Sequence, residues 1–507
     1  MARTPKQRYV LNLKLKTEFY QENILEKRFE IGRKLYNSVL GQALKRYKEM
    51  VKTKMWRENQ NNILEVYKNE KDIKKRKKLC KPYFNIKNEM LKEFRLNEYS
   101  LHEDVKSMQH KFKNNIDSFT AQKIASRVWI SLDDNLFGKG EMVHFKGINK
   151  PLNSLEGKNN NTGIRYKLET NMFLWNGLEI PTRLDVNNKY ETDALRDKIC
   201  FCRIKRKFIR GKYKYILQLI LEGIPPIKVN KQTGEVKNDI GIGNIGIDIG
   251  TQTVAYTSDF DCKLYELAPR VQNIENKKRI LLRYMDRSRR MNNPNNFNED
   301  GTIKHGVKLE WKYSKRYVKA KNKLKDLYRK QSDIREQEHN IMTNKILSNG
   351  DTVFVEKMNF KALQKRAKET TINEKTGKYN KKKRFGKSLA NKAPSMFLVI
   401  LKNKLKAKGG LYYEINTKEV KASQYNHLNQ EYNKKKLSQR WNYFDYNGKQ
   451  IKVQRDLYSS YLIKNVNGDL KSIDNELCIK DFNKFLKMHN KEILRLQGLN
   501  NLSSMGI

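Results

Sequence analysis

The spacing of apolar residues changes along the chain, and each change limits what the following segment can fold into. Residues 11–16 alternate between apolar and polar side chains, which predicts a half-buried strand. Between Leu25 and Tyr47 the apolar residues recur every three or four positions, which is typical of a long helix with one apolar face. We therefore expect a first strand within residues 1–16 and lysine-rich helices over residues 17–137.

Strand-like and turn-like sequence replaces the helical pattern from residue 138 to residue 240. Residues 199–221 predict a hairpin with Arg210, Gly211 and Lys212 at its turn. We interpret residues 138–240, together with the N-terminal strand, as one β-barrel-like domain. The helices of residues 17–137 are then an insertion into that domain.

Apolar strands and helices alternate in the rest of the chain. Short apolar strands at residues 245–251 and 352–358 each contain one acidic residue, and a helix at 394–408 precedes a strand at 411–415. This alternation favours an α/β domain. We expect that domain to occupy residues 241–422 and 451–507, with residues 423–450 as an insert. The whole chain is therefore expected to be a multidomain protein that combines an α/β domain with a β-barrel.

The charge balance points to a polyanionic partner. The chain has 106 Lys and Arg against 55 Asp and Glu, a formal net charge of +51, and the cations are spread over its whole length. Self-repulsion of this size disfavours a compact state unless an anion offsets it. No apolar run approaches the roughly 18 residues that a membrane span requires, so nucleic acid is the expected partner rather than a membrane. The five scattered cysteines favour a reducing cytoplasm without a disulfide framework.

Several cationic clusters are candidate nucleic-acid contacts, although the first of them could also be a solvated helix face. The candidates are Lys74, Lys75, Arg76, Lys77, Lys78, Lys381, Lys382, Lys383, Arg384, Lys434, Lys435, Lys436, Arg440 and Trp441.

Asp248 and Glu356 are the acids within the two apolar strands. A buried carboxylate without a partner costs several kcal/mol, so it persists where a cation neutralises it. A structural interpretation exists for each residue: Glu356 could pair with a base such as Lys357, and Asp248 could cap a turn beside Gly246 and Gly250.

A third acid makes a catalytic interpretation stronger. Asp456 opens a late helix, and the order Asp in a first strand, Glu in a later strand and Asp on a late helix is that of an RNase H-like two-metal site. Carboxylate oxygens suit Mg²⁺, and two such ions can promote phosphodiester cleavage. The three acids are about 100 residues apart, so only the tertiary fold can bring them together.

Three motifs resemble those of the TnpB family of transposon-encoded RNA-guided nucleases, to which the type V CRISPR effector nucleases are related. Residues 246–250 (GIDIG) resemble its first RuvC motif, residues 355–360 (VEKMNF) its second and residues 455–460 (RDLYSS) its third. Residues 385–388 resemble the loop that lies over the active site in that family, which makes Lys387 and Ser388 candidate lid residues.

The resemblance implies an RNase H-like RuvC nuclease domain, a wedge-like barrel and an inserted helical recognition lobe. It further implies an RNA-guided DNA endonuclease that uses two Mg²⁺ ions, binds a guide RNA and recognises target DNA beside a short flanking motif. The expected location is the bacterial cytoplasm, in association with the nucleoid. A nuclease-silent RNA-guided repressor and a protein-only transposase with an RNase H-like core are the alternatives.

The chain departs from the family pattern in the insert. Family members carry a zinc ribbon with two C-x-x-C pairs before the third motif, whereas residues 423–450 contain no cysteine and one histidine, His427. We expect no structural zinc here, because four suitable ligands are required. An aromatic cluster of Trp441, Tyr443, Phe444 and Tyr446 is expected to hold the insert in place, the alternative being a disordered loop.

Overall fold

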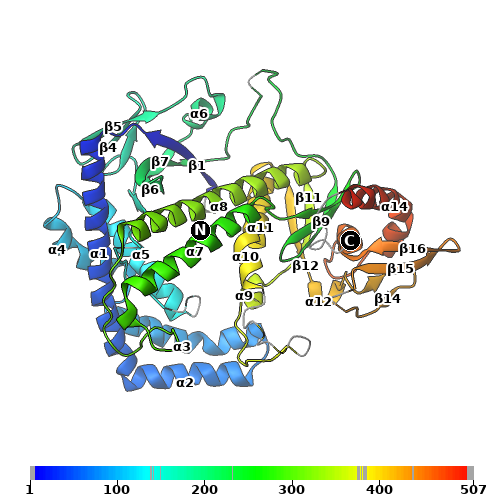
Figure 1. The fold of residues 1–507 in the computed structure, drawn as a ribbon, viewed down its shortest axis with the longest axis horizontal. Helices are drawn as coiled ribbons and strands as arrows, with labels where there is room; N and C mark the ends of the chain where they lie inside the picture. Colours follow the sequence, from blue (N-terminus) through cyan, green and yellow to red (C-terminus); the bar gives the residue numbers. More distant parts are fainter. Residues whose placement is uncertain are drawn as a thin grey trace. The chain divides into compact units, whose positions relative to one another are not determined.

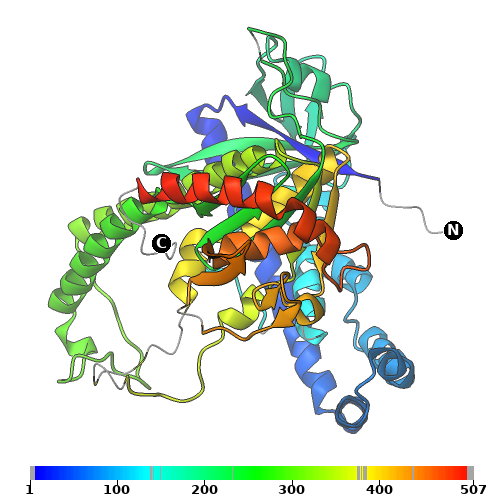
Figure 2. The same ribbon diagram turned by 90° about the vertical axis from the view of Figure 1, so that its right-hand side faces the viewer.

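The computed structural model describes residues 6–137, 140, 142–148, 150–230, 232–373, 377, 380, 385–436 and 439–498. The chain divides into two compact units, Met1–Ile227 and Lys228–Ile507 (Figures 1 and 2). The boundary expected between residues 240 and 241 therefore lies earlier. The reason is that the connecting segment binds the second unit: Lys408 Nζ donates to the Asn238 carbonyl, and the Gly241 N–H donates to the Leu347 carbonyl.

The first unit contains one seven-stranded antiparallel sheet with the order β2-β6-β7-β1-β5-β4-β3. Its strands are β1 (Arg8–Leu15), β2 (Ser154–Glu156), β3 (Arg165–Lys167), β4 (Met172–Trp175), β5 (Leu178–Arg183), β6 (Ile199–Ile209) and β7 (Lys212–Glu222), with α6 (Lys189–Ala194) between β5 and β6. β1 pairs with both β5 and β7, which confirms that the N-terminal strand belongs to this sheet. In the described residues β2 and β3 are unpaired edges, so the sheet is a half-barrel rather than a closed barrel.

The predicted hairpin is formed by β6 and β7. Arg210 and Gly211 occupy its two-residue turn with φ values of 48° and 85°. Two consecutive left-handed residues match the right-handed twist of the flanking strands, and glycine adopts this conformation without steric cost.

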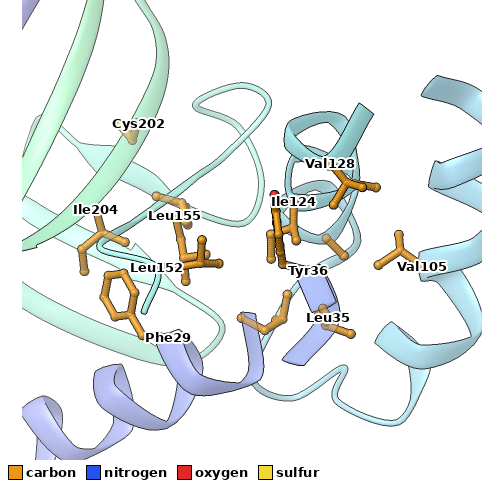
Figure 3. Close-up of a cluster of buried hydrophobic side chains, with 14 of the residues drawn as sticks. Phe29, Leu35, Tyr36, Val105, Ile124, Val128, Leu152, Leu155, Cys202 and Ile204 are labelled. Carbon is orange, nitrogen blue, oxygen red and sulfur yellow. The ribbon is translucent and has the colours of Figure 1, made fainter. Parts of the chain in front are cut away.

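Helices form over residues 17–137 as expected, but they do not have a hydrophobic core of their own. They are α1 (Phe19–Lys52), α2 (Lys54–Asn69), α3 (Ile73–Glu93), α4 (Glu98–His110) and α5 (Ser118–Leu136). Figure 3 shows Phe29 of α1 beside Ile204 of β6 and Leu155 of β2, and Ile124 of α5 close to Leu155. The apolar stripe of α1 is thus buried against both the sheet and the other helices, and helices and half-barrel share one core.

The second unit is built on a five-stranded mixed sheet with the order β10-β9-β8-β11-β12. Its strands are β8 (Asn244–Ile249), β9 (Thr253–Thr257), β10 (Cys262–Glu266), β11 (Thr352–Glu356) and β12 (Leu411–Ile415). β8, β9 and β10 are antiparallel neighbours, whereas β11 is parallel to both β8 and β12. The unit's helices are α7 (Val271–Asn292), α8 (Lys315–Leu347), α9 (Phe360–Leu363), α10 (Gly386–Lys392), α11 (Pro394–Ala407), α12 (Thr417–Val420), α13 (Arg455–Lys464) and α14 (Asn475–Gln497), with a 3₁₀ turn, η1, at Pro294–Asn296.

The insert forms two hairpins, so the disordered alternative is wrong for its described residues. They are β13 (Tyr425–Asn426) with β14 (Glu431–Tyr432), and β15 (Trp441–Tyr446) with β16 (Lys449–Gln454). β16 extends past the expected boundary at residue 450 and continues directly into α13.

The predicted aromatic cluster forms in part. Because side chains alternate along a strand, Phe444 and Tyr446 share the inner face of β15, whereas Tyr443 is 58% exposed on the outer face. Phe444 contacts Tyr458, and Tyr446 packs edge-on against Phe482. Trp441 also lies on the outer face, where Lys452 Nζ is 4.1 Å from its ring centroid.

None of the described helices is both long enough and apolar enough to cross a lipid bilayer.

Candidate active site

Two neighbouring parallel strands carry the first two acids. Asp248 lies near the carboxyl end of β8, and Glu356 ends β11. The register pairs Val355 with Ile247, so the next residue of each strand is the acid. Because parallel strands end at the same edge of a sheet, this register places both carboxylates together at that edge.

The third acid reaches this edge because α13 packs very closely on β8. A Cβ atom on Gly246 would lie 2.1 Å from the Ser460 carbonyl oxygen and 2.2 Å from the Lys464 backbone nitrogen. No side chain fits there, so the glycine allows direct contact between helix and strand backbones. The Ser460 hydroxyl also forms a 2.7 Å hydrogen bond with the Thr257 hydroxyl of β9. The small residues of two motifs thus position Asp456, in the first turn of α13. The structural role of Gly246 is therefore to admit α13. It does not form part of a turn that Asp248 caps.

The three acids line one cavity of about 490 Å³. The remaining lining residues are Ile249, Gly250, Thr251, Gln252, Thr253, Met358, Ser423, Gln424, Lys434, Lys435, Arg440 and Arg455. Acids therefore line part of the cavity and cations another part, and three of the cations come from the insert.

Asp248 and Glu356 are crowded carboxyl groups whose pKa values are raised, although the charge of Arg455 lowers the pKa of Asp248 in part. Burial raises the pKa of Asp248 well above its ordinary range, and the neighbouring charges of Glu356 and Asp456 raise it further. Burial raises the pKa of Glu356 to about 7. Within the described part of the chain no ion pair reaches either carboxylate, and Lys357 does not neutralise Glu356. The structural interpretation in which a protein base compensates Glu356 is therefore not supported.

Asp456 differs from the other two acids because arginines already engage it. Arg455 Nη2 is 3.2 Å from its Oδ1, and Arg440 Nη1 is 3.8 Å from its Oδ2. Across the described ranges, no three His, Cys, Asp or Glu side chains converge closely enough to hold a metal ion as they stand. The carboxylate donors suit Mg²⁺ in kind, and the arginine contacts of Asp456 occupy part of its acceptor capacity.

The candidate nucleic-acid contacts of the insert divide into two groups. Lys434, Lys435 and Arg440 line the cavity, whereas Lys436 and Trp441 do not. Lys435 Nζ donates to Asn442 Oδ1, and its pKa is lowered by burial and by the charge of Arg455.

The candidate lid residues lie away from the cavity lining. Lys387 and Ser388 belong to the helix α10, not to a loop. Lys387 Nζ is 3.6 Å from a Glu275 carboxylate oxygen, and the Ser388 hydroxyl donates to the Phe385 carbonyl. Their function over the active site stays a prediction.

The remaining cationic candidates lie outside this site. Residues 74–78 form the first turns of α3 in the first unit, where Asp72 caps the helix and Arg76 lies 4.5 Å from the Tyr67 ring centroid. Lys381, Lys382, Lys383 and Arg384 fall outside the described residues.

Sequence reasoning assigned no role to several residues of the cavity, among them Ser423, Gln424 and Arg455. Ser423 and Gln424 precede β13 and carry no recognisable pattern. Arg455 had a usable signal, since a base next to a proposed catalytic acid is a natural partner for it. His427 was considered only as a zinc ligand. It is fully buried, and its Nδ1 forms a 2.6 Å hydrogen bond with the Tyr458 hydroxyl.

No protein-family model and no curated protein matches this chain. Among solved structures, it is similar to a cryo-EM structure of a Cas12f1–sgRNA–target DNA complex, with a TM-score of 0.38 and 11% identity over 84% of this chain and 92% of that one. It is also similar to a cryo-EM structure of a CRISPR–Cas12f ternary complex, with a TM-score of 0.24 and 14% identity over 90% and 99% of the two chains. Both TM-scores are low, so we base no argument on this likeness.

Proposed function

We propose that this protein is an RNA-guided, Mg²⁺-dependent DNA endonuclease with catalytic carboxylates at Asp248, Glu356 and Asp456. The observation that carries the proposal is the convergence of three acids, from β8, β11 and α13, on one cavity that cations also line. The sheet order supports an RNase H-like RuvC domain, in which three antiparallel strands are followed by two parallel ones.

Asp248, Glu356 and Asp456 would hold two Mg²⁺ ions. When bound, such ions activate a water molecule and stabilise the leaving oxygen of a phosphodiester. The raised pKa values of Asp248 and Glu356 support this role, because two crowded carboxylates with no ion-pair partner among the described residues favour a bound divalent ion. Lys434, Lys435 and Arg440 would neutralise DNA phosphates at the cavity.

The guided mechanism rests on the motifs and on charge. The net charge of +51 suits binding of both a guide RNA and target DNA, where base pairing reads the sequence and the protein recognises backbone shape and a short flanking motif. The three motifs favour a transposon-encoded member of the TnpB family that acts in the bacterial cytoplasm, near the nucleoid. We also propose that this protein binds no structural zinc.

The test begins with protein purified without chelator, from which bound RNA is extracted and sequenced. A plasmid that matches the guide segment of that RNA should be cut in Mg²⁺ and remain intact in EDTA. Asp248→Ala, Glu356→Ala and Asp456→Ala should each reduce cleavage by about 1,000-fold or more while RNA binding persists. Asp445→Ala is the matched control, because Asp445 is an exposed carboxylate of the same unit that does not line the cavity.

Each rival function has its own outcome. Site-specific cutting by RNA-free protein would overturn the guided mechanism and favour a transposase. Guided binding without any cleavage in Mg²⁺ would favour a repressor, in which the arginine contacts of Asp456 are never released. Cleavage by one of the three alanine variants at the wild-type rate would remove that residue from the catalytic set. Zinc bound at one equivalent per chain would overturn the proposal that the insert holds no structural zinc.

A further inference from the structure

The hairpin of α7 and α8 is a strongly cationic segment of the second unit, and the proposed active site does not use it. Between Lys277 and Lys325 there are sixteen Lys and Arg but four Asp and Glu. α8 alone has 33 residues, a length of about 50 Å, and Figures 1 and 2 show the hairpin extending away from the five-stranded sheet of its unit. Past Lys278, α7 has no further buried residue.

The tip of this hairpin is an organised structure. Asn293, which is 6% exposed, donates from Nδ2 to the carbonyls of Arg289 and Lys312 and accepts from the Lys312 N–H. Arg290 Nη1 donates to the Gly301 carbonyl. These bonds join the end of α7 to the start of α8 and fix the backbone on which the aromatic side chains stand.

Aromatic rings and guanidinium groups are interleaved at the tip. Phe297 and Trp311 meet edge to face at 5.7 Å, and the guanidinium carbon of Arg289 lies 5.2 Å from the Trp311 centroid. Arg290 lies 4.8 Å from the Phe297 centroid. We call this group, together with Tyr313 and Tyr317, the aromatic tip.

Tyr313 and Tyr317 form the exposed part of the aromatic tip. Their rings are stacked, with centroids 4.5 Å apart and planes inclined by 16°, and Tyr313 is 46% exposed. Lys321 Nζ lies 5.9 Å from the Tyr313 centroid. Tyr313, which is exposed, and Tyr317, which is partly buried behind it in the stack, present a flat π-surface for a base, and the cations suit the phosphates on either side of it.

We infer that the aromatic tip binds unpaired nucleotides of a polynucleotide, with a base stacked on Tyr313 and its phosphates held by surrounding Lys and Arg. Unpaired bases are favoured over a duplex because bases within a duplex are stacked on one another and leave no free face for a tyrosine. The inference extends the proposed function, since it assigns a strand-binding surface distinct from the cavity. It does not depend on cleavage.

Cross-linking of the full chain in EDTA tests the inference. RNA-free protein is mixed with a short oligonucleotide that contains 4-thiouridine, its 4-thiothymidine DNA counterpart, or a duplex of the same length, and is then irradiated. Mass spectrometry should find adducts within residues 311–317 for a single-stranded probe. A preference between the RNA and DNA arms identifies which strand the tip holds. Absence of these adducts with both single strands, or equal labelling by the duplex, would overturn the inference.

Variants then separate the contribution of ring stacking to strand binding from the contribution of charge. Tyr313→Ala/Tyr317→Ala should abolish those adducts and weaken single-strand binding by about 5- to 100-fold at an unchanged salt slope. Tyr313→Phe/Tyr317→Phe should retain binding within about twofold, because the π-faces remain. Lys321→Gln should instead reduce the salt slope by about one unit.

Tyr328→Ala is the matched control, since Tyr328 is a 50% exposed tyrosine on the same helix and should have no effect. Equal losses from Tyr328→Ala and the tip variant would contradict a local site. Loss of cleavage in the Asp248→Ala variant bears on the active site alone, so the two proposals can fail separately.

Discussion

Opposite faces of α13 belong to two regions with contrasting physical character. Asp456 lines the carboxylate cavity, where no ion pair among the described residues reaches Asp248 or Glu356. Two residues later, Tyr458 enters a packed aromatic cluster made of His427, Phe444, Tyr446, Tyr458, Tyr461, Phe482 and Phe485. In this cluster Phe482 and Phe485 are essentially unexposed.

The comparison teaches that stability and proposed chemistry are supplied by different faces of one short helix. The cluster fixes the helix through apolar burial, which lets the cavity keep repelling charges that would by themselves weaken the fold. The cluster also holds the insert against the rest of the unit, since it joins Phe444 and Tyr446 to α13 and α14.

The largest effect should come from the contact that joins the two regions. Gly246→Val would force a side chain into the backbone of α13, and backbone atoms at 2.1 and 2.2 Å cannot move aside locally. We expect a loss of about 4 kcal/mol or more in the free energy of unfolding, measured by urea denaturation, and a loss of cleavage. Gly468→Ala is the control, because a Cβ there meets nothing within 4 Å. Wild-type stability in Gly246→Val would show that α13 does not rest on β8.

Removal of a ring from the cluster should affect stability and leave the cavity chemistry intact. Phe482→Ala should lower the free energy of unfolding by about 3 kcal/mol, because it opens a cavity among packed rings. Cleavage per folded molecule should stay near the wild-type value at low temperature. Tyr443→Ala, on the exposed face of the same insert, should change stability by less than about 0.5 kcal/mol. If both variants behave alike, the cluster does not hold the insert.

Neutralisation of a cavity acid should raise the free energy of unfolding, whereas the two changes above lower it. Asp248→Asn should abolish cleavage yet raise the free energy of unfolding in EDTA by about 1 kcal/mol, since it removes repulsion from Glu356 and Asp456. Mg²⁺ should raise the melting temperature of the wild type but not of the variant, because only the wild type retains the full ligand set. Asp445→Asn serves as the control. A destabilised Asp248→Asn protein would mean that the cavity acids are compensated after all.

The last prediction concerns how the free energy of unfolding depends on pH. Burial lowers the pKa of His427 to about 4 from its ordinary 6.5, so the unfolded chain binds more protons than the folded chain between these values. The free energy of unfolding should therefore fall as the pH falls from about 6.5 to about 4, by about 2 to 3 kcal/mol for this residue. His427→Phe should flatten that slope in urea titrations. Tyr458 would still accept the residue 427 backbone N–H, and an unchanged slope would contradict a neutral, buried His427.

The spacing of apolar residues predicted the helices and strands well. It did not predict which of their side chains are buried in a common hydrophobic core. Ala320, Leu327, Ile334 and Ile341 recur every seven residues in the sequence, but they do not form one buried stripe. In α8 Ala320 and Leu327 are buried but Ile341 is 51% exposed. A straight helix turns by about 20° per heptad relative to such a repeat, so the buried face moves to other residues, such as His339.

The sequence by itself determined which segments are strands and helices, that a polyanion is the expected partner, and which three acids are unusual for their apolar or helix-opening positions. Periodicity and charge are properties of neighbouring residues, so they can be read without a fold. Only the tertiary structure decided that the helical insertion and the half-barrel have a common core, and that Gly246 admits the backbone of α13. These depend on which surfaces meet across about 100 residues or more of chain, and that is set by packing rather than by local pattern.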